Sequence, residues 1–277
     1  MGIFDGYLLA SDIDGTLLDN GYINPRNIEK IKFFVKEGGA FAIATGRSVG
    51  AVSMVTDAID CIGPSVVANG AMIYDYKSQE IIKEYLLPEC DKRVVGFVIN
   101  ISSDIGVEIH SGKNVLVANA TSETDDHEQY EKLSVEKMPL SEAIKYSWTK
   151  VLFAFSNVEK RAEIRNQIMG LNIESDLFDT IAYIDGRTRY YLEVVPKGIS
   201  KADSLQNLCS LLGIKKGGFF AIGDYYNDLT MIKNADIGAT TADAPEEIKQ
   251  CSDFVGGSCK NGAVADFIEY LTKIFTN

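Results

Sequence analysis

Apolar and polar positions follow two alternating patterns in the first part of the chain. Short apolar runs, typical of buried strands, precede Asp12 and occupy 40–44 and 65–68. Between them, apolar residues recur every three to four positions, as on one face of a helix, first after Asn24-Pro25 and again over 49–59. This strand–helix–strand–helix–strand order predicts a parallel sheet with right-handed crossovers.

The pattern changes between about residues 84 and 194. Strands are expected at 115–117, 150–155, 180–184 and 188–194. Asp185-Gly186 predicts a tight hairpin between the last two strands, and 121–131 is a polar stretch. Both histidines and the one tryptophan fall in this segment: His110, His127 and Trp148. Packing within the segment, or exposure for the histidines, is favoured over a chemical role.

After Pro196 the alternation of helix and strand returns. Ser200 is expected to cap a helix that presents Leu205, Leu208, Leu211 and Leu212 and ends at Gly213. Further elements are expected at 218–222, 229–234, near Ile237 and at 263–275. We therefore predict an α/β protein whose Rossmann-like, doubly wound parallel-sheet core consists of 1–83 and 195–277. An α+β domain at 84–194 is inserted into this core.

Composition narrows the choice of partners and compartment. The chain has 277 residues and a formal net charge of -12, which disfavours nucleic acid and anionic membranes as partners. An anionic substrate would then need locally assembled positive charge. Five cysteines without a C-x-x-C pair, no apolar run long enough to span a membrane and no signal segment predict a reduced, cytoplasmic protein.

Four polar clusters follow predicted strands. Three come at the ends of core strands, and the fourth, Lys201, comes after a strand and a turn. They are Asp12 with Asp14, Thr45-Gly46, Lys201, and Asp224 with Asn227 and Asp228. Taken singly, each cluster is explained by ordinary local structure, as a solvated turn, a helix cap or a surface lysine. Together they predict a ligand site, because the carboxyl ends of parallel strands meet at one sheet edge. Two adjacent carboxylates also require a nearby cation to stay ionised.

These segments resemble a known family. Asp12-Ile13-Asp14-Gly15-Thr16-Leu17 matches the D-x-D-G-T-L signature of the haloacid dehalogenase-like superfamily of phosphotransferases. Ala44-Thr45-Gly46-Arg47, Lys201 and Ile222-Gly223-Asp224 through Asp228 are similar to its second, third and fourth motifs. Asn69-Gly70-Ala71 and 244–249 resemble the Cof-type branch, which carries an α+β cap between motifs two and three.

The resemblance implies a role for each motif residue. Asp12 would be the nucleophile that forms an aspartyl-phosphate, and Asp14 the general acid and base. Mg²⁺ would be held by Asp12, Asp14 through its backbone carbonyl, and Asp224, with Asp228 binding or supporting it. The phosphate and substrate ligands would be Thr45, Gly46, Arg47, Lys201 and Asn227, of which Thr45 and Lys201 also serve catalysis. Thr45-Gly46 is expected at a helix N-terminus. Tyr225-Tyr226 departs from the small residue and Glu common in relatives.

The sequence thus predicts a Mg²⁺-dependent phosphatase of small phosphorylated metabolites, with sugar phosphates as the favoured class. The inserted domain would be a cap that sets specificity, and the protein would be a monomer or small homo-oligomer. Three alternatives stay open: a phosphomutase of the same superfamily, a non-enzymatic signalling module phosphorylated on Asp, and a non-catalytic scaffold.

Overall fold

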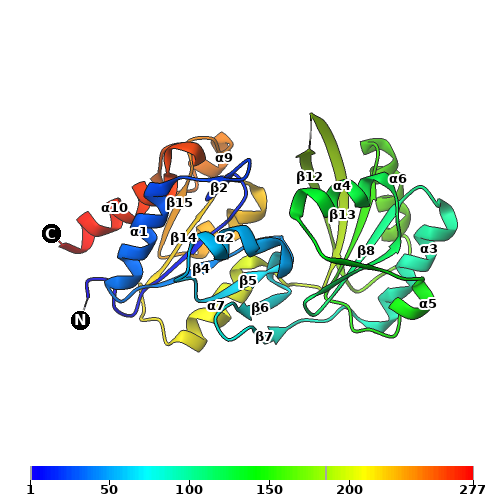
Figure 1. Cartoon of the computed structure of the whole chain (residues 1–277), viewed down its shortest axis with the longest axis horizontal. Coiled ribbons are helices and arrows are strands. Elements are labelled where there is room, and N and C mark those ends of the chain that lie inside the picture. The colour runs from blue at the N-terminus through cyan, green and yellow to red at the C-terminus, as the bar shows by residue number, and fades with distance from the viewer. Residues whose placement is uncertain (1, 185, 277) are drawn as a thin grey trace. The chain divides into compact units, whose positions relative to one another are not determined.

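The chain divides into two compact units (Figure 1), described by a computed structural model over residues 2–184 and 186–276. The first unit runs up to Gly46, includes Val52–Lys83 and resumes at Ser200. The second consists of Arg47–Ala51 and Glu84–Ile199. The predicted insertion at 84–194 lies within this second unit, which also takes in 195–199 and 47–51. That it acts as a cap stays a prediction.

A five-stranded parallel sheet forms the centre of the first unit, in the order β16-β15-β14-β1-β4. Its strands are β1 (Leu8–Ser11), β4 (Ala40–Ile43), β14 (Phe219–Gly223), β15 (Ile237–Thr240) and β16 (Phe254–Val255). Strand β1 lies between β4 and β14, with Leu8 opposite both Ala40 and Phe219. Residues that follow β1, β4 and β14 therefore emerge at the same edge of the sheet.

Short strands extend the first unit beyond this sheet. A three-stranded sheet is formed by β5 (Pro64–Val67), β6 (Met72–Asp75) and β7 (Glu80–Glu84). An isolated parallel bridge between Ala44 and Val66 joins it to the end of β4. A small hairpin of β2 (Leu18–Asp19) and β3 (Tyr22–Ile23) follows the first aspartate motif.

The helices of the first unit largely follow their sequence signals. They are α1 (Pro25–Lys36), α2 (Ser53–Ala58), α7 (Lys201–Leu212), α8 (Leu229–Asn234), α9 (Glu246–Lys249) and α10 (Ala263–Thr276). The Asn24 side chain caps α1 by accepting from the Arg26 amide at 2.9 Å, and Ser200 caps α7. The predicted apolar face of α7 is partly wrong, because Leu211 and Leu212 are exposed. The predicted Leu205 and Leu208 are buried, together with Ala202.

The helix predicted over 49–59 is shorter than expected. A 3-10 turn spans Gly50–Val52, and α2 begins only at Ser53. The expectation that Thr45-Gly46 lies at a helix N-terminus is therefore wrong. The intervening residues 47–49 are not helical, and they belong to the second unit.

The second unit is built on a six-stranded sheet in the order β10-β9-β8-β11-β13-β12. Its strands are β8 (Gly106–Ser111), β9 (Asn114–Asn119), β10 (Val135–Lys137), β11 (Lys150–Phe155), β12 (Asp176–Ile184) and β13 (Arg187–Val195). All neighbours pair antiparallel except β9 and β10. The predicted hairpin is present as β12 and β13, whereas Asp185 of its turn lies outside the described residues.

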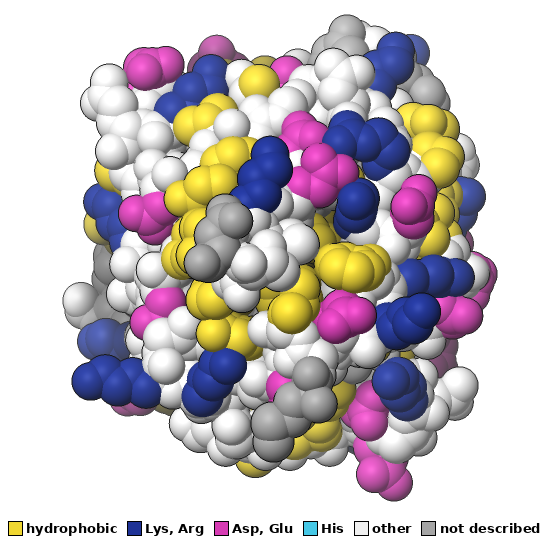
Figure 2. Space-filling view, turned by 90° about the vertical axis from the view of Figure 1, so that its left-hand side faces the viewer, with side chains coloured by type: hydrophobic (Ala, Val, Ile, Leu, Met, Phe, Trp, Pro, Cys, Tyr) yellow, Lys and Arg dark blue, Asp and Glu magenta, His cyan; other side chains and the backbone are white. Residues whose placement is uncertain are grey.

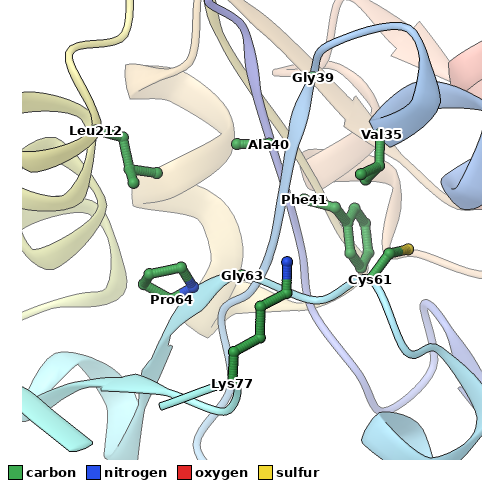
Figure 3. A pocket seen from close by; sticks show the side chains of 9 residues that line it. All are labelled: Val35, Gly39, Ala40, Phe41, Cys61, Gly63, Pro64, Lys77 and Leu212. Carbon is green, nitrogen blue, oxygen red and sulfur yellow. The ribbon is translucent and has the colours of Figure 1, made fainter.

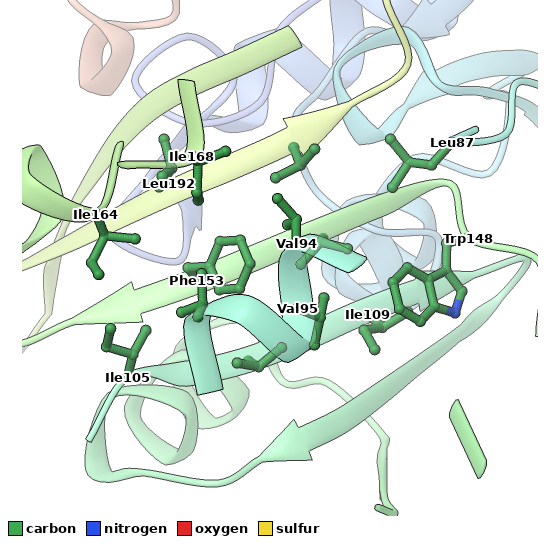
Figure 4. Close-up of a cluster of buried hydrophobic side chains, with 14 of the residues drawn as sticks. Leu87, Val94, Val95, Ile105, Ile109, Trp148, Phe153, Ile164, Ile168 and Leu192 are labelled. Atoms are coloured by element: carbon green, nitrogen blue, oxygen red, sulfur yellow. The ribbon is translucent and has the colours of Figure 1, made fainter. Parts of the chain in front are cut away.

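One face of this sheet packs an apolar core against α3 (Arg93–Ile101) and α6 (Val158–Met169), near the short α5 (Leu140–Ala143). Figure 4 shows Val94 and Val95 of α3, Ile164 and Ile168 of α6, and Phe153 of the sheet in one cluster. Trp148 is fully buried in it, and its indole donates to the Ala143 carbonyl at 2.8 Å. The structure confirms that Trp148 packs in a core, as the sequence analysis favoured.

Helix α4 (Ser122–Glu131) packs against β8 and β11 of the same unit. The sequence offered only a polar stretch here, because the helix has no apolar stripe. Its buried residues are Glu123, Thr124 and His127, and at its start the Thr121 amide donates to the Thr124 hydroxyl at 2.9 Å. His110 on β8 is also buried. Over the described residues, no helix is long and apolar enough to cross a membrane.

Candidate active site

The two aspartates after β1 lie in different environments. The Asp12 side chain is buried, with the residue only 5% exposed, while Asp14 is exposed. The Asp12 amide donates to the Ile222 carbonyl of β14 at 3.0 Å, which holds the end of β1 beside the fourth motif. A buried carboxylate suits a nucleophile shielded from water, and an exposed one can exchange protons with it.

Lys201 reaches Asp12 from the first residue of α7. Its ammonium lies 2.6 Å from Asp12 Oδ1 and 2.6 Å from Asp228 Oδ1, and the residue is 2% exposed. The strand that precedes it, β13, pairs antiparallel with both its neighbours in the sheet of the second unit, so Lys201 does not follow a parallel core strand. Its approach depends on Gly70 (φ 106°), where a Cβ would lie 2.3 Å from the Ser200 carbonyl oxygen.

The fourth motif supplies Asp224 and Asp228. The Thr16 hydroxyl donates to Asp224 Oδ1 at 2.9 Å, and a Cβ on Gly15 (φ 79°) would lie 2.3 Å from Asp224 Oδ2. Asp228 Oδ2 accepts from the backbone amides of Asp224 and Tyr225 at 3.1 and 3.2 Å. The sequence places Thr16 in the first motif but indicates no role for it. The hydrogen bond from Thr16 to Asp224 joins residues 208 positions apart, so no local sequence pattern predicts it.

Negative charge exceeds positive charge in this buried cluster. Burial raises the pKa of Asp12 well above its usual value, and Asp228 raises it further, against the opposing effect of Lys201. Burial and Asp228 likewise raise the pKa of Asp224 to about 7, although the Thr16 hydrogen bond opposes the shift. Burial lowers the pKa of Lys201, but Asp12 and Asp228 outweigh burial and leave it raised. One ammonium therefore does not compensate the carboxylates.

A divalent cation fits this arrangement. One carboxylate oxygen from each of Asp12, Asp224 and Asp228 lies within 4.8 Å of the others. Within 2–184 and 186–276, no other cluster of histidine, cysteine or acidic side chains has this geometry. All donors are carboxylate oxygens, the ligands that Mg²⁺ prefers, and a bound cation would offset the repulsion that raises the two pKa values.

The remaining core residues of the predicted site lie after β4 and β14. The Thr45 amide donates to the Val66 carbonyl, and the Asn69 amide donates to the Thr45 carbonyl, both at 3.0 Å. A Cβ on Gly46 would lie 2.9 Å from Asn69 Oδ1. Asn69, noted in the sequence only for its branch resemblance, thus lies against the second motif. Asn227 is exposed in the 3-10 turn Tyr226–Asp228.

The Arg47 side chain makes its described contacts within the second unit. It donates to the Ala51 carbonyl at 3.0 Å, and its guanidinium carbon lies 5.7 Å from the centre of the Tyr130 ring. Burial raises the pKa of Glu131, but His127 and, to a smaller extent, Arg47 lower it. The substrate-binding role predicted for Arg47 stays a prediction.

A pocket of the first unit is separate from these residues (Figure 3). It is lined by Val35, Gly39, Ala40, Phe41, Cys61, Gly63, Pro64, Lys77 and Leu212. It includes the amino-terminal end of β4, whereas the second motif follows the carboxyl-terminal end of that strand. No residue predicted for the site lines it.

Charges of both signs are mixed on the face that carries α1 and α10 (Figure 2). Ion pairs between Arg26 and Asp266, at 2.9 Å, and between Lys30 and Glu269, at 3.1 Å, join these two helices. A mixed surface of this kind differs from the one-signed basic surface that binds nucleic acid.

Comparison with known proteins gives a consistent family. Residues 9–268 match the haloacid dehalogenase-like hydrolases. The chain is 27% identical to a 5-amino-6-(5-phospho-D-ribitylamino)uracil phosphatase of Bacillus subtilis, over 95% of this chain and 97% of the relative. It is similar to the crystal structure of a haloacid dehalogenase-like hydrolase from Bacteroides thetaiotaomicron, with a TM-score of 0.85, 25% identity, and coverage of 96% and 99% of the two chains.

A subclass IIB sugar phosphatase of the same superfamily shares the fold, with a TM-score of 0.79, 19% identity, and coverage of 96% and 99%. The parallel α/β fold and the resemblance to the superfamily and its Cof-type branch are confirmed. The prediction of an enzyme, a hydrolase of the phosphatase class, is confirmed as well. Since the match spans nearly the whole chain, this protein belongs to the haloacid dehalogenase-like hydrolase family.

Proposed function

We propose that this protein is a Mg²⁺-dependent phosphatase of small phosphorylated metabolites, with sugar and sugar-alcohol phosphates as the substrate class. The observation that carries the proposal is the Lys201 ammonium, held at 2.6 Å from both Asp12 and Asp228 beside Asp224. A buried carboxylate with one fixed cation, and with neighbouring carboxylates that could hold a second, is suited to attack on an anionic phosphoryl group.

In the proposed reaction, a carboxylate oxygen of Asp12 forms a bond to phosphorus as the bond from phosphorus to the ester oxygen breaks. Asp14 gives its proton to that departing oxygen, so the alcohol leaves neutral. Asp14 then takes a proton from a water molecule, whose oxygen attacks the phosphorus of the aspartyl-phosphate. The Asp12 carboxylate is regenerated and phosphate is released. Asp14 is exposed, in keeping with a group that exchanges protons with water.

The carboxylates of Asp12 and Asp224 would hold Mg²⁺, together with the backbone carbonyl of Asp14. When bound, Mg²⁺ would neutralise phosphoryl oxygens and lower the repulsion between the phosphate and Asp12. Asp228 has Lys201 on one oxygen and two backbone amides on the other. We therefore place Asp228 chiefly in support of Lys201 and the Asp224 loop.

The same chain supplies phosphate ligands. The Thr45 hydroxyl, the Gly46 amide, the Lys201 ammonium and the Asn227 amide are proposed to bind phosphoryl oxygens. Lys201 also lies at the first turn of the 12-residue helix α7, whose dipole favours an anion. Arg47 is proposed to contribute to substrate binding.

The substrate class rests on the relatives. One similar protein is named for a phosphorylated ribityl compound, and a structural neighbour is described as a sugar phosphatase. Both names denote a phosphate monoester on a polyhydroxylated carbon chain, which supports the same class for this chain.

The test is phosphate release from a panel of sugar, sugar-alcohol, nucleotide and cofactor phosphates, with Mg²⁺ or with EDTA. We expect activity that requires Mg²⁺ and is lost in Asp12→Asn. Asp60→Asn is the matched control, because Asp60 is an exposed aspartate that pairs with Lys32 at 3.2 Å. Release by Asp12→Asn at the normal rate would overturn the mechanism. Activity that depends on a bisphosphate activator would favour the phosphomutase.

A further inference from the structure

Two adjacent tyrosines occupy the loop that carries Asp224. Tyr225 and Tyr226 lie between β14 and α8, and they are 55% and 51% exposed. Among the aromatic side chains that the structure describes, these two have the largest exposed fractions. A single exposed tyrosine needs no explanation, whereas two in succession beside a buried acidic cluster form a distinct aromatic surface.

Several contacts fix this surface in place. The two rings pack edge to face, with their centres 5.1 Å apart and their planes at 76°. The Tyr226 hydroxyl donates to Glu247 of α9 at 3.4 Å. The Tyr225 amide donates to the fully buried carboxylate of Asp228 at 3.2 Å. Tyr225 therefore stands on a backbone held by the acidic cluster, with its ring braced by Tyr226.

The position of this surface matters because Tyr225 directly follows Asp224. Asp224 lies in the same carboxylate cluster as Asp12, which the proposed function makes the phosphoryl acceptor. A group esterified to that phosphate has to extend from the cluster across neighbouring surface. Stacking of a nucleic-acid base on an aromatic side chain contributes about 1–3 kcal/mol. A rigid exposed tyrosine offers that energy at little cost in ordering.

We propose that Tyr225, braced by Tyr226, is a specificity residue that stacks against the face of a ring in the leaving group of the substrate. The inference rests on the proposed function, and it narrows the substrate class to phosphate esters whose alcohol carries a ring. That face is the flat π face of a heteroaromatic ring or the apolar C–H face of a sugar ring, and either packs against the face of a tyrosine.

The experiment compares ring-bearing and open-chain esters by steady-state kinetics with saturating Mg²⁺. Flavin mononucleotide and glucose 6-phosphate carry rings, whereas ribitol 5-phosphate and glycerol 3-phosphate do not. The variants are Tyr225→Ala, Tyr225→Phe and Tyr146→Ala. Tyr146 is a control tyrosine of the second unit that is 39% exposed. Circular dichroism checks that every variant is folded.

We expect Tyr225→Ala to raise KM for ring-bearing esters about tenfold relative to the open-chain esters, with kcat changed much less. Tyr225→Phe should restore the low KM, because the ring rather than the hydroxyl binds. An effect confined to flavin mononucleotide identifies a heteroaromatic ring, and an equal effect on glucose 6-phosphate extends the site to sugar rings.

Two results would overturn the inference and are distinguishable from each other. A change in KM that is equal for ring-bearing and open-chain esters, or no change, removes the specificity role and leaves the proposed phosphatase intact. Release of no phosphate by the unaltered protein from any of the four esters removes the proposed function and this inference with it.

Discussion

Each of the two units buries a cluster of charged side chains, and the two clusters differ in their balance of charge. In the first unit Asp12, Asp224 and Asp228 share the single ammonium of Lys201. In the second, His127 lies 2.9 Å from Glu108 and 3.5 Å from Glu131, near other cationic side chains. Each cluster combines fully buried side chains with one that is partly exposed, Asp224 in the first and Glu131 in the second, so burial alone does not distinguish them.

The direction of the pKa shifts does distinguish them. In the first unit the pKa values of Asp12 and Asp224 are raised, because burial and repulsion exceed the attraction of Lys201. In the second, burial opposes the charged forms of His127 and Glu131. Attraction to Glu108, and then to Glu131, nevertheless raises the pKa of His127 to about 10, and attraction to His127 lowers the pKa of Glu131 to about 2. The first cluster needs a further cation and is suited to function, whereas the second is internally compensated and is suited to structure.

The largest expected effect is that of removing Lys201. Lys201→Met should reduce phosphate release more than about a thousandfold, since a loss of roughly 4 kcal/mol of transition-state stabilisation corresponds to that factor. The assay is phosphate release with saturating Mg²⁺. Lys92→Met is the matched control, because Lys92 is a buried lysine of the second unit that donates to the Ile144 and Tyr146 carbonyls. Equal losses in both variants would show that only folding had been lost.

Removing His127 should affect stability rather than chemistry. His127→Gln leaves Glu108 and Glu131 buried without their partner, which costs about 3 kcal/mol at neutral pH. The folded pKa of about 10 exceeds the unfolded value of 6.5, so this contribution is complete below pH 6.5 and is lost as pH rises through 10. The measurement is urea unfolding followed by Trp148 fluorescence. The difference in free energy of unfolding between wild type and variant should decrease as pH rises from 6.5 through 10.

His110→Gln is the control for that pH dependence. Burial, and then Lys150, lowers the pKa of His110 well below its usual value, so it is neutral throughout the same range. The difference in free energy of unfolding between wild type and His110→Gln should therefore stay constant between pH 8 and pH 11, the range chosen to cover the titration of His127. A constant difference for His127→Gln as well would contradict the compensated-cluster interpretation.

Adding Mg²⁺ should stabilise the first unit by an intermediate amount. Binding to the folded state alone contributes about 2.7 kcal/mol when the ion is at a hundredfold excess over its dissociation constant. Calorimetry should show a rise in Tm that Asp224→Asn removes and Asp60→Asn keeps. A rise that persists in Asp224→Asn would place the ion elsewhere.

The smallest expected effect concerns Thr16. Thr16→Val removes the hydroxyl that orients Asp224 and should weaken Mg²⁺ binding about tenfold, the lower end of the usual range for such supporting contacts. Thr16→Ser keeps the hydroxyl and should bind as the unaltered protein does. The readout is Mg²⁺ titration by calorimetry, and identical affinities for the Val and Ser variants would contradict the orienting role.

Local signals predicted the elements that have them. Helix α8 (Leu229–Asn234) has its predicted bounds, and α1 begins at the expected Asn24-Pro25 cap, because capping and periodicity act within a few residues. Helix α4 was not predicted, because its buried face is polar. His127 on that face pairs with Glu108 of β8, which belongs to another element. The exposure of Leu211 and Leu212 could not be predicted either, because the position of an apolar residue on a helix face does not show whether another element packs against it.

The sequence by itself determined the order of the parallel core elements and the place of each motif along them, because spacing and strand ends are local properties. Only the tertiary structure decided which charges meet. Lys201 pairs with Asp12 across 189 positions and arrives from a helix start rather than a strand end. The balance of each cluster, and hence the direction of its pKa shifts, depends on distance through space and on burial, and neither is written in the spacing of residues along the chain.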